Sequence, residues 1–526
     1  MKLSRRAFLG SAAPFLAGGC RNLFTIGYAA PHRPPASERI NLAIIGCGTQ
    51  AYDNVNQFLQ DPRVQIVTTC DPVLEAPGYS YKAHMPGGRL VFKRKVDEKY
   101  GNTSCRMDED WRRVIDDPSV DAVAIITPDH WHALIAIEAM KRGKHVYCQK
   151  PLTVGIAEGQ AMVRAAKKSG VTFQVGNQGR SDSRHRVAAE LAINGYIGAL
   201  KGIHVAIPCG SGGLYGHGLD TTRRKIPPYF TKETWALWQG PAAHWDDEAF
   251  IPAIHEPMCW RWNRRYGGGM ITDFGAHEFD LMHQGIGMDR SGPVAIENFS
   301  ASEWQEDRSI FSWAGAFDFD FVYANGVRVH VTNMKPDVPR GVTFIGEKGT
   351  ISTVGGLKRP DFLRKWNEKR DLKDSEIHLY RPKDGHSHEM DFIDGIYENR
   401  PICTDCEIGH RTISAAHIAN ICERLGEKSL KWDPVAERFI GNDAANALID
   451  VPYCNGYSLD VYGSGTTWHR HAENSSEARR RGSSSPRGGS TARTSGATSR
   501  GCASSRSGRA AWAGATSASC STPATW

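Results

Sequence analysis

Short apolar runs alternate with segments of helical periodicity between residues 40 and 176. The run INLAIIG precedes the helix-like YDNVNQFLQ, and VQIVTTCD follows as a second apolar run. After a polar insertion and a short helix near DWRRVI, the alternation continues through DAVAIIT, HVYCQ and VTFQVG. Strands separated by helices of this length form a parallel sheet with right-handed crossovers. We therefore predict an α/β fold whose first part is a doubly wound parallel sheet of the Rossmann type.

The pattern changes after about residue 180. Stretches such as AGAFDFDFVYANGVRVHVTN, GVTFIGEKGTIST and IHLYRP alternate apolar and polar residues, and the first two contain the turn sequences ANG and EKG. Such alternation is typical of antiparallel strands with one solvent-exposed face. We expect a helix over residues 408–425 to close this part. The second domain is thus predicted to be α+β, with a largely antiparallel open sheet.

A chain of 526 residues is too long for one hydrophobic core. We divide it into a leader and linker over residues 1–39, a parallel-sheet domain over 40–178, a second domain over 179–460 and a tail over 461–526. The second domain is expected to bind substrate and to mediate oligomerisation. From residue 463 onward the tail lacks Leu, Ile, Val, Met, Phe and Tyr. It is expected to be disordered, because it cannot bury enough apolar surface to offset its ordering entropy. Out-of-frame translation and a basic nucleic-acid-binding arm are the alternative interpretations of the tail.

The net charge of +7 comes from this tail, which holds nine arginines and two glutamates and neither Lys nor Asp. The remaining 462 residues therefore sum to zero, which argues against a general nucleic-acid-binding surface. The sequence contains no run of about 18 apolar residues, so we predict no membrane span.

The leader contains SRRAFL followed by an apolar stretch that ends near Ala17. A basic start followed by a short apolar region is typical of a twin-arginine export signal, and predicts a periplasmic protein. Cys20, in the sequence AGGC, offers an alternative site for a lipid anchor, although residue 17 is Ala rather than Leu.

The sequence GCGTQA fits the G-x-G-x-x-A pattern of a dinucleotide-binding loop, since it follows a predicted strand and opens a predicted helix. Asp71 ends the next strand, where a carboxylate accepts hydrogen bonds from a ribose diol and repels a 2′-phosphate. The context favours NAD over NADP, while a tight glycine turn with Asp71 as a helix cap is the structural alternative. The predicted cofactor contacts here are Gly46, Gly48, Gln50, Ala51 and Asp71.

Two further polar motifs end predicted strands at the same carboxyl edge of the sheet, where ligands bind in open α/β folds. TPDHWH supplies Thr127, Pro128 and His132, and CQKPLT supplies Gln149 and Lys150. Pro151 favours an extended Lys150, which would aim its amine across the cleft. We predict that all five contact the cofactor and that Lys150 is also catalytic, although His132 could instead be the first polar residue of a helix.

The third motif is GGGMITDFGAHEFD. If a helix begins near Ile271, then Asp273, His277 and Asp280 lie on one face. A histidine beside a carboxylate can be held in one tautomer and act as a base near neutral pH. The pair CTDC at Cys403 and Cys406 lacks a second pair at zinc spacing, so we predict no metal site and leave a single disulfide open.

These motifs together, in this order, resemble the glucose–fructose oxidoreductase/inositol dehydrogenase (Gfo/Idh/MocA) family. The resemblance covers residues 40–457 and includes QKPL, FIGEKGTI and EIGHR. It implies that Lys150, Asp273 and His277 are catalytic. Oxidation of an alcohol requires removal of the hydroxyl proton as hydride leaves for the nicotinamide, so we predict His277 as base, Asp273 as its orienter and Lys150 as the group that stabilises the alkoxide. Gln149 departs from the family, which usually has Glu there.

A carbohydrate substrate and a homo-oligomer are expected from this resemblance. The predicted substrate contacts are Asn177, Gln178, Arg180, Arg261 and Trp262.

Export separates the enzyme from the cytoplasmic NAD pool, so the bound cofactor would have to be regenerated within one catalytic cycle. Oxidation of one sugar coupled to reduction of another would do this, as would transient oxidation, elimination and re-reduction in an NAD-dependent glycosidase. Gln149 stands where the family usually has Glu, and the family has no counterpart of the tail. These two departures leave a non-catalytic sugar-binding protein as the remaining hypothesis.

Overall fold

The computed structural model describes residues 34–77, 85–208, 227–242, 259–302, 312–333 and 340–459. The predicted export signal, the Cys20 lipid site and the tail lie outside these residues. Within the described ranges, no helix combines the length and the apolarity needed to cross a membrane.

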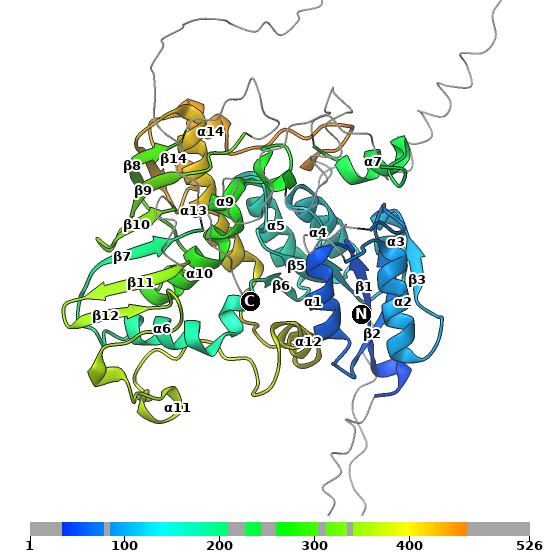
Figure 1. Ribbon diagram of the computed structural model, residues 1–526, viewed down its shortest axis with the longest axis horizontal. Helices are drawn as coiled ribbons and strands as arrows, with labels where there is room; N and C mark the ends of the chain where they lie inside the picture. Colours follow the sequence, from blue (N-terminus) through cyan, green and yellow to red (C-terminus); the bar gives the residue numbers. More distant parts are fainter. Residues whose placement is uncertain are drawn as a thin grey trace, which may run out of the picture.

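The first domain is built on six parallel strands in the order β3-β2-β1-β4-β5-β6, which confirms the predicted doubly wound sheet (Figure 1). Both faces are covered by helices, so the central strands β1 and β4 are apolar and buried except at Asn41. The strands are β1 Ile40–Ile45, β2 Val64–Cys70, β3 Arg106–Asp108, β4 Ala122–Ile125, β5 His145–Gln149 and β6 Phe173–Gly176. The helices are α1 Thr49–Phe58, α2 Arg89–Tyr100, α3 Trp111–Asp116, α4 His132–Lys141 and α5 Ile156–Ser169.

The sequence did not predict α2 or β3. Only Phe92 and Val96 of α2 are buried, so its apolar periodicity is weak. Strand β3 has three residues and lies at the sheet edge, with none of its residues buried.

The second domain contains eight strands in the order β12-β11-β7-β10-β9-β8-β13-β14. All neighbours are antiparallel except β7 and β10, so the predicted largely antiparallel sheet is confirmed. The turn sequences ANG and EKG join β9 to β10 and β11 to β12. The strands are β7 Leu200–Ala206, β8 Ala295–Ala301, β9 Phe317–Val322, β10 Arg328–Thr332, β11 Gly341–Gly346, β12 Gly349–Ser352, β13 Leu430–Asp433 and β14 Arg438–Phe439.

The strand expected at IHLYRP is absent, because its backbone is bound by side chains at the end of α6 (Ser183–Ile193) rather than by a neighbouring strand. The Leu379 amide donates to Glu190 and the Ile377 amide donates to Asn194.

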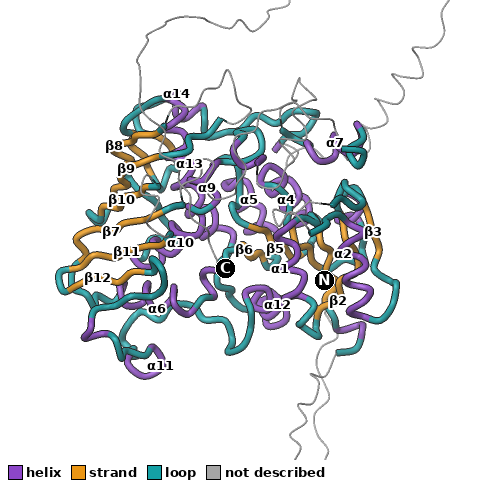
Figure 2. The backbone as a smooth tube through the Cα atoms, viewed as in Figure 1, coloured by secondary structure: helices purple, strands orange, loops and turns teal. Residues whose placement is uncertain are grey.

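Helices fill the space between the two sheets (Figure 2). The central one is α13, which packs against α5 of the first domain and α10 and β8 of the second. The sequence predicted this helix to within two residues of its start. The helices of this part are α6 Ser183–Ile193, α7 Lys232–Gln239, α9 Gly269–Asp273, α10 Gly275–Ile286, α11 Glu368–Asp371, α12 His388–Glu398, α13 Cys406–Leu425 and α14 Asp443–Ala447.

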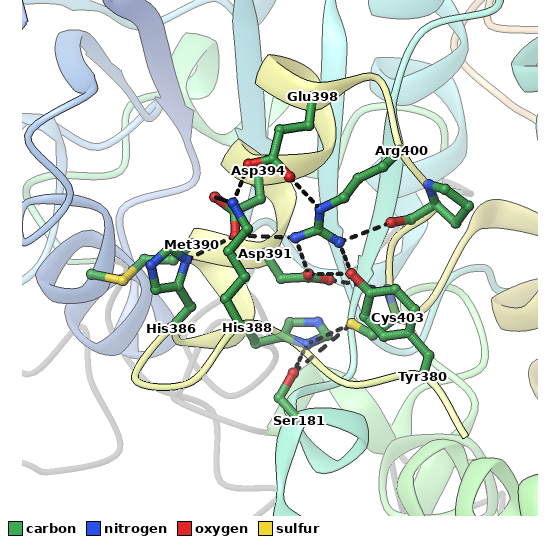
Figure 3. Close-up of polar contacts among 12 residues, drawn as sticks. Ser181, Tyr380, His386, His388, Met390, Asp391, Asp394, Glu398, Arg400 and Cys403 are labelled. Atoms are coloured by element: carbon green, nitrogen blue, oxygen red, sulfur yellow. Dashed lines mark hydrogen bonds and ion pairs between the residues drawn. The ribbon is translucent and has the colours of Figure 1, made fainter. Parts of the chain in front are cut away.

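Helix α12 returns to the first domain although it lies far beyond residue 178. Its Phe392 and Ile393 are fully buried in the same apolar cluster as Leu42 of β1. Arg63 of the first domain pairs with Asp394 of α12 at 2.6 Å. Arg400, just after the helix, pairs with Asp391 and Asp394 at 3.1 and 3.0 Å (Figure 3). The core of the parallel sheet is thus completed by a distant segment of the chain.

Candidate active site and cofactor site

The loop after β1 has the geometry that a dinucleotide phosphate requires. Gly46 has φ +96°, and a Cβ there would lie 2.5 Å from the backbone of Ile126. Gly48 caps α1 without a side chain, and the first turn of α1 holds no acidic residue. The N-terminus of a helix with this kind of loop favours an anion.

Asp71 directly follows β2 and accepts hydrogen bonds from this loop and from its own. Its Oδ2 accepts from the Cys47 amide at 2.8 Å, and its Oδ1 accepts from the Val73 amide at 2.9 Å. The carboxylate also lines a pocket with Gly46, Thr127 and Pro128. The buried Thr127 hydroxyl has no hydrogen-bond partner in the structure as described, so a ligand in the pocket could supply one. The N-terminus of α1 suits a pyrophosphate, and the Asp71 carboxylate suits the hydroxyls of a ribose. Together with the Thr127 hydroxyl, these groups fit a nicotinamide dinucleotide. Gln50 is exposed in the first turn of α1, and Ala51 is buried beneath it.

Lys150 follows β5 directly and reaches the second domain. Its Nζ donates to Asp273 Oδ1 at 2.7 Å and to the Asp273 carbonyl at 2.8 Å. Arg261 Nε lies 3.1 Å from the same Oδ1. Burial lowers the pKa of Lys150, and Arg261 lowers it further while Asp273 opposes the shift. Arg261 and Lys150 hold the pKa of Asp273 well below its usual value despite its burial.

His277 lies in α10 with its tautomer fixed by Asn177. Asn177 Nδ2 donates to the Ala276 carbonyl at 3.0 Å, so its Oδ1 faces His277 Nδ1 at 2.7 Å and accepts the proton there. Nε2 then carries the lone pair. Burial, together with the positive charges of Lys150 and Arg340, lowers the pKa of His277 well below its ordinary value. A neutral imidazole with an unprotonated Nε2 is the form that a general base needs.

This arrangement corrects the predicted role of Asp273. The residue that orients His277 is Asn177, and Asp273 instead pairs with Lys150 and Arg261. The expected single helix is broken at Phe274 into α9 and α10, so Asp273 and His277 lie on different helices.

Two residues that the sequence analysis did not single out adjoin this group. The Phe274 ring lies 5.7 Å from Lys150 Nζ and 5.1 Å from the Arg340 guanidinium carbon. Asp129 is buried, which raises its pKa well above the usual value, while Arg261 and Lys150 oppose that shift. Asp129 could have been found from its place at the end of a strand in TPDHWH.

Several predicted contacts turn out to support the site rather than line it. Arg180 is 4% exposed and pairs with Asp280 and Asp289, both at 2.7 Å, which corrects its assignment to substrate. His132 is buried with Nδ1 2.8 Å from the Pro151 carbonyl and Nε2 2.9 Å from the Thr127 carbonyl, so its ring links the loops after β5 and β4. Trp262 is 7% exposed and belongs to the core.

Gln149 and Gln178 join a buried polar network. Gln149 Nε2 donates to Asn54 Oδ1 at 2.9 Å, and Gln178 Nε2 donates to the Tyr147 hydroxyl at 3.0 Å. Asn54 in turn donates to Glu389 of α12 at 2.7 Å. The amide nitrogens of both glutamines are therefore bound by protein.

Cys403 and Cys406 are buried free thiols, so the disulfide left open by the sequence is not formed. Cys403 Sγ lies 3.2 Å from His388 Nδ1, next to Ser181 Oγ (Figure 3). His388 Nε2 donates to the Val175 carbonyl, so Nδ1 accepts. Burial raises the pKa of the Cys403 thiol well above its usual value, which makes it a poor nucleophile.

Comparisons with known proteins show the family and the fold. The family model described as an oxidoreductase family with an NAD-binding Rossmann fold matches residues 40–177, and the model of that family's C-terminal alpha/beta domain matches residues 218–459. A crystal structure of the WlbA dehydrogenase from Bordetella pertussis in complex with NADH and UDP-GlcNAcA shares the fold. Its TM-score is 0.51 at 16% identity, covering 75% of this chain and 99% of that one.

Curated relatives match over shorter segments. Levoglucosan dehydrogenase of Pseudarthrobacter phenanthrenivorans is 40% identical over 17% of this chain and 23% of its own length. The scyllo-inositol 2-dehydrogenase (NAD(+)) of Bacillus subtilis is 37% identical over 30% of this chain and 42% of its own length. Glycosyl hydrolase family 109 protein 1 of a Shewanella species is 27% identical over 26% and 28%, respectively. The chain thus spans less than half the length of each of these relatives.

Proposed function

The chain belongs to the Gfo/Idh/MocA oxidoreductase family and binds NAD, and on that premise we propose that it oxidises a CH–OH group of a sugar or polyol. The observation that carries the proposal is the His277–Asn177 hydrogen bond of 2.7 Å, which leaves Nε2 as a base in the same charged group as the Lys150 ammonium. The dehydrogenases among the curated relatives support this substrate class.

The roles of the residues follow from charge. The loop at Gly46 and the carboxylate of Asp71 would hold NAD, which would supply an acceptor for a hydride from the substrate carbon. His277 Nε2 takes the hydroxyl proton, and Asn177 Oδ1 accepts a hydrogen bond from Nδ1 of the imidazolium that forms. Lys150 stabilises the negative charge that develops on the substrate oxygen. Asp273 keeps Lys150 in place and charged through its 2.7 Å contact.

The RR leader supports a further part of the proposal, namely that the protein is exported with its cofactor bound. NAD regeneration would then occur within one catalytic cycle, by reduction of a second sugar. The family 109 glycosyl hydrolase relative favours a second candidate, in which oxidation, elimination and re-reduction cleave a glycoside. Both chemistries return the cofactor to its starting state.

One experiment separates these functions. The purified protein is incubated with a panel of sugars, polyols and glycosides without added cofactor, while absorbance at the NADH band and the products are followed. Paired oxidised and reduced sugars support the sugar–sugar reaction, and a released aglycone supports the glycosidase. Turnover only with added NAD would indicate a simple dehydrogenase and reject the closed cycle.

Substitution of the two central residues tests the reaction class itself. Lys150→Ala or His277→Ala should lower turnover by about 10²- to 10⁴-fold, as for other lost acid–base groups. Lys168→Ala, on the exposed face of α5, is the matched control and should have no effect. Full activity in both site variants would refute the proposal, and sugar binding without any change in bound NAD would favour a non-catalytic sugar-binding protein.

A further inference from the structure

The pocket at Asp71 has a wall that comes from the second domain. One side is formed by the loops after β1, β2 and β4, including Asp71 and Pro128, and by Trp111 of α3. The other side includes Leu237 and Trp238 of α7. Figure 1 shows α7 beside α3 and α4 at the upper right, far from the sheet of its own domain.

Several contacts fix α7 in this position. Trp131 Nε1 donates to the Trp238 carbonyl at 2.8 Å. Gly240 follows α7 with φ +51°, and a Cβ there would lie 2.0 Å from the Trp131 ring. Asn455 Nδ2 donates to the carbonyls of Gly240 and Ala242 at 2.7 and 3.0 Å. The end of α7 is therefore held by the nucleotide-binding edge on one side and by a later segment of the chain on the other.

The inner surface of this wall is aromatic. Trp238 is 4% exposed and stacks on Trp235 with ring centroids 5.0 Å apart, and its ring lies 5.3 Å from that of Tyr266. Trp111 and Trp131 face the same pocket and pack edge-to-face at 5.8 Å. Flat aromatic surfaces of this kind suit a purine ring. The pocket is lined by Asp71, whose carboxylate suits a ribose, and by none of Lys150, Asp273 and His277. It therefore suits the adenosine half of the dinucleotide rather than the nicotinamide half.

We propose that α7 is part of the cofactor site, with Trp238 and Leu237 contacting the adenosine half of NAD, and that NAD leaves only after α7 has detached from Trp131. Every dissociation event must then break the Trp131–Trp238 and Asn455–Gly240 hydrogen bonds. The cofactor is accordingly retained between turnovers by an element of the second domain. This inference concerns NAD binding and holds whatever the substrate is.

The test uses the full chain freed of cofactor and then loaded with NADH, ADP-ribose or nicotinamide mononucleotide. Trp238→Ala should weaken ADP-ribose binding by about tenfold, as expected for loss of one aromatic contact to a base. It should also speed NADH dissociation, measured by stopped-flow displacement with excess NAD, and leave nicotinamide mononucleotide binding unchanged. Lys232→Ala, an exposed change on the same helix, is the control.

Asn455→Ala provides a second variant that leaves the pocket lining intact. Both association and dissociation of NADH should become faster, with a smaller change in the dissociation constant. This variant decides the question if Trp238→Ala fails to fold, as judged by its thermal unfolding. NADH dissociation at the wild-type rate in Asn455→Ala, or equal weakening of ADP-ribose and nicotinamide mononucleotide by Trp238→Ala, would overturn the proposal.

Discussion

His277 and Asn177 show how one amide sets the chemistry of the site. The Asn177 side chain cannot rotate freely, because its nitrogen donates to the Ala276 carbonyl. Its oxygen therefore selects the Nδ1-protonated tautomer of His277. Asn177 was predicted to contact substrate, and in the structure its side chain hydrogen-bonds to Ala276 and His277.

Asn177→Ala should lower kcat by about tenfold to a hundredfold, because the imidazolium that forms during the reaction loses a hydrogen-bond acceptor. Asn177→Asp should instead raise the pKa of His277, since a carboxylate stabilises the protonated ring. The acid limb of the pH–rate profile should then move to higher pH than in the wild type. Steady-state kinetics between pH 5 and 9 measure both effects, and an unchanged acid limb in Asn177→Asp would contradict the assignment of the base.

Asp273 controls the charge of Lys150. Burial lowers the pKa of Lys150, and Asp273 limits that shift. Asp273→Asn removes the anion, so the pKa of Lys150 should fall further and its positive charge should be lost at a lower pH. The alkaline limb of the pH–rate profile should move to lower pH in this variant. An alkaline limb that stays in place would show that Lys150 is not the group that titrates there.

At the scale of elements, the β1–α1 loop depends on the close approach of Gly46 to the strand beside it. Gly46→Ala would put a methyl group 2.5 Å from the Ile126 backbone and force a left-handed φ on alanine. We expect NAD affinity to fall by tenfold or more, measured by calorimetry. Gly101→Ala is a matched comparison, since Gly101 has φ +66° with no atom within 4 Å of an added Cβ. It should carry only the backbone strain of about 1–2 kcal/mol and keep its NAD affinity.

At the scale of the whole molecule, the two domains share their cores. Phe392 of α12 is fully buried in the parallel-sheet cluster, and α13 packs on helices of both domains. Phe392→Ala should therefore cost about 3–5 kcal/mol in the free energy of unfolding. Urea denaturation should show a single transition at a lower midpoint, with NAD binding weakened near that midpoint. Phe362→Ala, at a 61% exposed position, should leave the midpoint unchanged, and two separate transitions would contradict the shared core.

The sequence by itself determined the elements whose residues are close together along the chain. The parallel sheet, the glycine loop, the hairpins at ANG and EKG and the helix ending at Leu425 follow from local periodicity and turn residues, and the structure has them all. The sequence also indicated that Lys150, Asp273, His277 and Arg261 serve one site. Lys150 directly follows a buried strand, and such residues lie at the ligand-binding edge of the sheet. Asp273, His277 and Arg261 lie on helical segments of the second domain, and they were assigned to the site from the family resemblance and from their residue types.

The tertiary structure alone decided which side chain partners which. Asn177 and Asp273 are both polar and both near His277, and only the break at Phe274 turns Asp273 toward Lys150 and leaves His277 to Asn177. The sequence predicted that Arg180 contacts a sugar, but in the structure it forms ion pairs with Asp280 and Asp289. Helices α7 and α12 carry no local signal for the first domain, yet both complete it. Hydrogen bonds and close packing depend on distances of a few ångströms between segments far apart in sequence, and periodicity contains no information on those distances.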